Sequence, residues 1–116
     1  MDYRKRTFER YISTQLLAVN PTAVQRDYAK FERYCRNNYL PLLPADRSAR
    51  ILDVGCGMGR FLYFLLANGY KNALGIDTGA ESVEHCRVRG YAAEHDDALS
   101  HIGRHTGEYH AIVMND

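Results

Sequence analysis

The chain has 116 residues, the length of a single small domain. Hydrophobic residues make up 46% of the sequence and charged residues 25%, as in an ordinary globular protein. A formal net charge of +1 gives no overall attraction to nucleic acid or to an anionic membrane, and no apolar run is long enough to span a bilayer.

The cysteines and the first residues bear on the cell compartment. Cys35, Cys56 and Cys86 are an odd number and form no C-x-x-C pair, so the sequence predicts neither a disulfide framework nor a zinc site. Residues 1–5 lack the apolar segment of a signal peptide. We therefore expect a reduced, cytoplasmic protein.

Residues 1–48 have helical character and form the first predicted segment. A helical pattern covers residues 4–15, and a second helix is expected over Pro21–Asn38, with Asn20 as its N-cap. Apolar residues recur in this second helix at spacings of three and four, which predicts a packing stripe on one face. The stripe consists of Val24, Tyr28, Phe31 and Cys35.

Strands and helices alternate in the second predicted segment, residues 49–116. Such alternation is typical of an α/β fold with a parallel sheet covered by helices on both faces. The expected strands are 51–54, 73–76, 91–94 and 110–114, and the expected helices are 59–68, 80–89 and 98–105.

A glycine-rich loop follows the first of these strands. Gly55, Gly57 and Gly59 allow a sharp turn and the close approach of a ligand to the backbone. A dinucleotide fingerprint would place its third glycine at position 60, where Arg60 stands. Asp53, at the end of the strand, would repel a pyrophosphate but attract an ammonium or a sulfonium. The loop therefore predicts a zwitterionic, cationic ligand.

Asp77 ends the second strand and is a further candidate ligand-binding residue. An acid at this place can accept hydrogen bonds from both hydroxyls of a ribose. Together, Asp53 and Asp77 predict a ligand with an amino-acid end and a ribose end.

These motifs resemble those of the class I S-adenosylmethionine-dependent methyltransferases. Residues 51–59 are similar to their motif I, Leu74–Asp77 to their second motif, and Asp97–Leu99 to the acid that follows their third strand. Residues 109–116 look like their fourth strand, with His110 where the family often has Asp. The resemblance implies the N-terminal part of a Rossmann-like, seven-stranded fold, with four strands in the order 3-2-1-4.

The resemblance also implies S-adenosylmethionine as cofactor and a methyl acceptor that these residues do not identify. Carried over position by position, the implied contacts are Asp53 with the methionine ammonium; Gly55, Cys56 and Gly57 with the methionine portion; Asp77, beside Thr78, with the ribose; Asp97, beside Ala98, with the adenine; and Asn115 near the transferred methyl.

Two other functions remain open at this point. The chain could be a non-catalytic module that binds a nucleoside or assembles with a partner, or a nicotinamide-dependent oxidoreductase, which Arg60 and Asp53 disfavour. Because the sequence stops after the fourth expected strand, we interpret it as a truncated methyltransferase domain with little activity by itself.

Several candidate residues also have a purely structural interpretation. Asp97 could be the N-cap of the helix that follows it. Tyr11 and Tyr28 could line an acceptor site, but packing is the favoured interpretation. His101 and His105 are spaced as two metal ligands on a helix, but no acid is placed to complete a site, so no metal is predicted.

The fourth expected strand bears on assembly. Residues 111–114 are all apolar, which is typical of a strand buried on both faces of a parallel sheet. In this chain its outer edge would carry unpaired backbone groups without a lysine or proline to block pairing, and a missing helix would leave apolar side chains uncovered. We therefore expect a homodimer or larger assembly through this edge.

Overall fold

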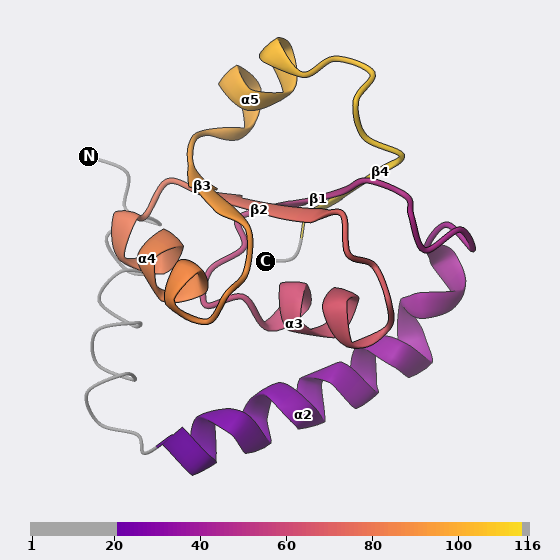
Figure 1. Cartoon of the computed structure of the whole chain (residues 1–116), viewed down its shortest axis with the longest axis vertical. Coiled ribbons are helices and arrows are strands. Elements are labelled where there is room, and N and C mark those ends of the chain that lie inside the picture. The colour runs from indigo at the N-terminus through magenta and orange to yellow at the C-terminus, as the bar shows by residue number, and fades with distance from the viewer. Residues whose placement is uncertain (1–20, 115–116) are drawn as a thin grey trace.

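The computed structural model of the chain describes residues 21–114, and Figure 1 shows their arrangement. The expected helix over residues 4–15, the N-cap Asn20 and the candidate residues Tyr11 and Asn115 lie outside the described residues. None of the described helices is both long and apolar enough to span a membrane.

A parallel sheet of four strands forms the middle of the structure, in the order β3-β2-β1-β4. This order and the α/β fold confirm the sequence-based prediction. β1 pairs with β2 and with β4, so that it is the most enclosed strand and all but its last residue are buried. The strands are β1 (Ile51–Val54), β2 (Ala73–Asp77), β3 (Ala93–His95) and β4 (Ala111–Met114).

Helices cover both faces of the sheet (Figure 1). α3 (Arg60–Ala67) and α4 (Ala80–Val88) lie on one face, and α5 (Ala98–Arg104) lies on the other. The chain moves outward from β1 to β3 and then crosses back to β4, so the direction of winding changes between β1 and β4. In open α/β sheets, ligands bind beyond the carboxyl ends of the strands at such a point.

A third layer is formed by α2 (Pro21–Asn38), which packs on the outer side of α3 (Figure 1). Tyr28 and Cys35 of the predicted stripe are buried, which confirms it as a packing surface. Two polar contacts join the helices: Arg60 lies 3.2 Å from Asp27, and the Asn68 amide donates to Glu32. The helix is therefore held firmly against the sheet domain.

The connection between α2 and β1 is fixed by a second buried tyrosine. After the short 3-10 helix η1 (Leu40–Leu42), the carbonyl of Pro44 accepts a hydrogen bond from the Tyr70 hydroxyl. Arg47 donates to the same hydroxyl at 2.8 Å. Tyr70 is fully buried and anchors this connection beyond the C-terminal end of α3, whereas the glycine loop precedes the N-terminal end of that helix.

β3 begins two residues later than the expected strand 91–94 because Gly90 and Tyr91 form the turn that closes the end of α4. Gly90 has a φ of 87°, and the Tyr91 amide donates to the Cys86 carbonyl, which closes the last turn of the helix. The Tyr91 ring is thereby directed toward Gly59 in the glycine loop.

β4 is partly covered on one face of the sheet and exposed on the other, so apolar side chains are left uncovered, as expected for this strand without a further covering helix. Ala111 and Val113 pack against the core on the α3 side, but Ile112 is 47% exposed and Met114 is 71% exposed. Successive side chains of a strand point to opposite faces, and the short helix α5 leaves this part of the second face uncovered. Among the described residues, β4 has a neighbouring strand on one edge, β1.

We expect the chain to form a dimer or larger assembly at micromolar concentration in light scattering, because the open edge and the exposed apolar side chains of β4 favour pairing with another strand. Ile112→Lys should shift the population to monomer. Leu99→Lys is the matched control, since Leu99 is 87% exposed on α5 and does not belong to the edge. A wild-type chain that stays monomeric would exclude this pairing.

Candidate functional site

The glycine loop lies between β1 and α3 and turns through three glycines with positive φ. Gly55, Gly57 and Gly59 have φ values of 72°, 56° and 87°, a region that other residues adopt only at a cost. The amides of Gly55 and Cys56 both donate to the Ile76 carbonyl, at 2.8 and 3.0 Å. The loop is thus folded back onto the end of β2.

Gly75 of β2 makes this close approach possible. A Cβ atom at this position would lie 2.7 Å from the Cβ and Sγ atoms of Cys56 and 2.7 Å from Leu62. Cys56 is buried in this contact. Its hydrogen bond with the Cys86 thiol, and then burial, raise the pKa of Cys56 far above the ordinary value, so that it stays a neutral thiol. Its side chain is therefore a packing group.

Asp53 is the most unusual side chain of the site. It is 1% exposed, and neither of its carboxylate oxygens has a hydrogen-bond partner in the part of the chain that the structure describes. Burial, and then the charge of Asp77, raise the pKa of Asp53 to about 7. An unpartnered buried acid destabilises a folded chain, and each such group in a native structure calls for an explanation.

Asp77 shapes the neighbouring part of the site. One carboxylate oxygen accepts a hydrogen bond from the Gly57 amide at 3.0 Å, and the other accepts from the Gly79 amide at 2.7 Å. Each carboxylate oxygen has a further lone pair available, so Asp77 can hold the loop and accept hydrogen bonds from a ligand. The structure thus brings Asp53, Asp77 and the glycine loop together at the carboxyl ends of β1 and β2.

The acids after β3 have structural partners. Asp97 is the N-cap of α5: its side chain accepts from the Ser100 amide at 2.9 Å, which confirms the structural interpretation and lowers the pKa of this exposed carboxyl. Ala98 is the first residue of α5, and the Thr78 carbonyl lies 2.9 Å from His95 Nε2. The ligand contacts assigned to Asp97, Ala98 and Thr78 stay predictions.

The family model of the methionine biosynthesis protein MetW matches residues 38–116. The chain belongs to the MetW family. The matched range contains the whole sheet, the glycine loop, Asp53 and Asp77, whereas most of α2 lies outside it. A search of curated proteins gives no match.

Solved structures similar to this MetW-family chain are methyltransferases. The plantazolicin methyltransferase, determined in complex with SAH, is 22% identical over 97% of this chain and 42% of its own, with a TM-score of 0.56. Magnesium protoporphyrin IX methyltransferase from Synechocystis, with bound SAM, is 14% identical over 98% and 62%, with a TM-score of 0.55.

A SAM-dependent methyltransferase from Archaeoglobus fulgidus is 23% identical over 66% of this chain and 33% of its own, with a TM-score of 0.54. The chain thus spans between 33% and 62% of the length of these three proteins. At these identities the similarity establishes the fold, which is that of the class I methyltransferases.

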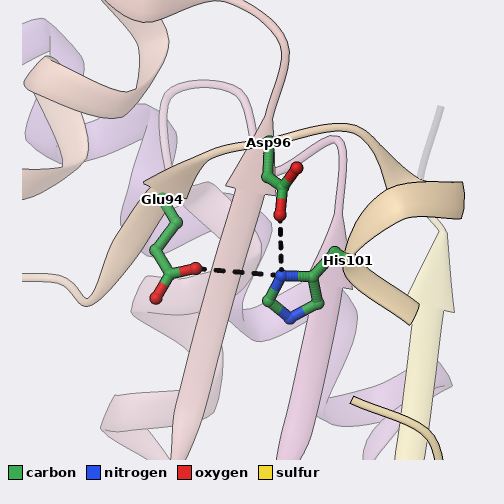
Figure 2. Close-up of side chains that lie close together, drawn as sticks. All are labelled: Glu94, Asp96 and His101. Carbon is green, nitrogen blue, oxygen red and sulfur yellow. Dashed lines mark hydrogen bonds and ion pairs between the residues drawn. The ribbon is translucent and has the colours of Figure 1, made fainter. Parts of the chain in front are cut away.

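The side chain of His101 lies in a cluster that the sequence analysis missed (Figure 2). Its Nδ1 is 3.1 Å from Asp96 and 3.7 Å from Glu94, and its Nε2 is 2.7 Å from the Tyr109 hydroxyl. The expectation that no acid lies near this histidine was wrong, because β3 ends beside the first turn of α5. The sequence signal that could have indicated this cluster is the position of His101 a few residues after Glu94 and Asp96.

This cluster has the residue types of a metal site, and it is the one such group within the described residues. Two observations favour an anchor for α5 instead. Both ring nitrogens of the buried His101 already have partners, and the Arg104 guanidinium pairs with Asp96. His105, which shares the ligand-like spacing with His101 in the sequence, stacks on His101 and bonds to Glu108.

Gly75→Ala should destabilise the chain by about 1–3 kcal/mol, because the new methyl group would overlap Cys56 and Leu62. Gly103→Ala is the matched control: nothing lies within 4 Å of a Cβ built on this glycine of α5, so the change should stabilise by about 0.5–1 kcal/mol. Urea unfolding would measure both. Equal effects of the two changes would contradict the close approach of loop and strand.

Asp53→Asn should raise the thermal unfolding midpoint at pH 8 by several degrees and leave it nearly unchanged at pH 4. The pKa of Asp53 is about 7 in the folded chain and about 3.9 in an unfolded chain. The proton held in the folded state therefore contributes stability that is fully present below pH 4 and is lost as the pH rises to 7. A difference between the variant and wild type that does not change with pH would contradict this.

Proposed function

We propose that the chain binds S-adenosylmethionine at the carboxyl ends of β1 and β2 and forms the cofactor-binding part of a methyltransferase. The observation that carries the proposal is the buried carboxylate of Asp53, which has no hydrogen-bond partner among residues 21–114 and lies beside the glycine loop. A ligand ammonium placed there would satisfy the carboxylate and lower its pKa, which would recover the cost of its burial.

The other residues would contact different parts of the ligand. The free lone pairs of Asp77 would accept the ribose hydroxyls, while its present bonds to Gly57 and Gly79 keep its orientation. Gly55 is exposed and, having no side chain, leaves the backbone accessible to the methionine portion. Asp97, Ala98, Thr78 and Asn115 complete the proposed set.

Three solved methyltransferases with this fold support the class of reaction. When bound, S-adenosylmethionine supplies a methyl group already activated by its sulfonium. The residues of this chain would therefore contribute mainly binding and orientation. Asp53 would hold the amino-acid end and Asp77 the ribose, which together would fix the direction of the methyl group.

Isothermal calorimetry with S-adenosylhomocysteine and with NAD would test the proposal. We expect binding of S-adenosylhomocysteine and none of NAD, because Asp53 repels a pyrophosphate. Asp53→Asn and Asp77→Asn should each weaken binding by about tenfold or more, as expected for hydrogen bonds to a charged group.

Glu84→Gln is the control variant, since Glu84 is an exposed acid on α4, and it should bind like wild type. Binding of neither compound, or tighter binding of NAD, would reject the proposal. Because Asp53→Asn is expected to be the more stable protein, weaker binding in this variant could not be attributed to unfolding.

A further inference from the structure

The hydroxyl of Tyr28 reaches from α2 into the glycine loop. It donates a hydrogen bond to the carbonyl of Met58, between Gly57 and Gly59, although 30 positions separate the two residues. Tyr28 is 2% exposed and lies outside the range that the MetW family model matches. A residue of the outer helix layer is thus in direct contact with the proposed cofactor loop.

The surroundings of Tyr28 direct its proton to that carbonyl. The alternative acceptor, His85 Nε2, is 3.3 Å away and already accepts a hydrogen bond from Arg89 at 3.1 Å. Burial, and then the charge of Arg89, lower the pKa of His85, so that its ring stays neutral. The Arg89 guanidinium lies 4.5 Å from the centre of the Tyr28 ring and keeps the ring in place.

Hydrogen bonds from three elements hold the loop. The Ile76 carbonyl of β2 accepts from Gly55 and Cys56, and the Cys86 thiol of α4 donates to the Gly57 carbonyl at 3.2 Å. Tyr28 supplies the third contact, from α2. The first two contacts lie at or before Gly57. Among these contacts from other elements, the Tyr28 contact is the one at the Met58–Gly59 peptide, whose amide also bonds within the loop to the Cys56 carbonyl.

We infer that Tyr28 is a positioning residue, which sets the shape of residues 57–59 and thereby the affinity of the site for an amino-acid-bearing adenosine ligand. The part that concerns the ligand rests on the proposed function. The part that concerns the loop does not, because it follows from the contacts of the chain itself. α2 would accordingly be an element of the binding site although it does not touch the ligand.

The test compares Tyr28→Phe with Tyr70→Phe in the full chain. Both variants remove the hydroxyl of a buried tyrosine that donates to a backbone carbonyl, of Met58 in one case and of Pro44 in the other. Similar losses of thermal stability are expected. Two readouts then separate the variants: amide hydrogen exchange of residues 56–60 without ligand, and calorimetric affinity for S-adenosylhomocysteine.

Tyr28→Phe should speed exchange at Gly59, whose amide bonds to the Cys56 carbonyl, by about fivefold. It should also weaken ligand binding by about fivefold, whereas Tyr70→Phe should change neither quantity. Equal exchange in the two variants would overturn the inference, whether or not wild type binds the ligand. Faster exchange in Tyr28→Phe and no wild-type binding would uphold the positioning role and reject the proposed function.

Discussion

The contact between the glycine loop and β2 is the constraint on which the rest of the site depends. The loop can fold back onto the Ile76 carbonyl because Gly75 has no side chain where Cys56 packs. This contact fixes the turn from β1 into α3 and directs the Gly57 amide to Asp77. Asp53 and Asp77 thus lie together toward the carboxyl ends of their strands. A methyl group at position 75 would displace the loop and, with it, the site.

Asp53 illustrates the conflict between stability and binding. Its buried carboxylate has no hydrogen-bond partner in the described part of the chain, which weakens the fold, and the second acid nearby raises its pKa further. Such an arrangement is stable only within a core that tolerates the cost, here the apolar packing of β1 between α3 and its two neighbouring strands. Strained or unsatisfied groups of this kind are concentrated at functional sites.

The two faces of the sheet are held by different kinds of contact. On one face, α3 buries aromatic and aliphatic side chains and is itself covered by α2. On the other face, α5 is anchored by the hydrogen bonds of His101 to Asp96 and Tyr109. α5 does not extend over β4, and Ile112 and Met114 of that strand are exposed, in agreement with the sequence-based expectation of uncovered apolar side chains.

The sequence by itself determined the features that depend on neighbouring residues: the helix over Pro21–Asn38, the strand Ile51–Val54 and the glycine loop, because periodicity and positive φ are local properties. The joint role of Asp53 and Asp77 followed from the acids that end two successive strands, whereas the order of the strands followed from the resemblance to a known fold. Only the tertiary structure decided which side chains meet across the layers. The bond from Tyr28 to Met58 and the cluster around His101 join residues on separate elements, and no local pattern encodes the distance between them.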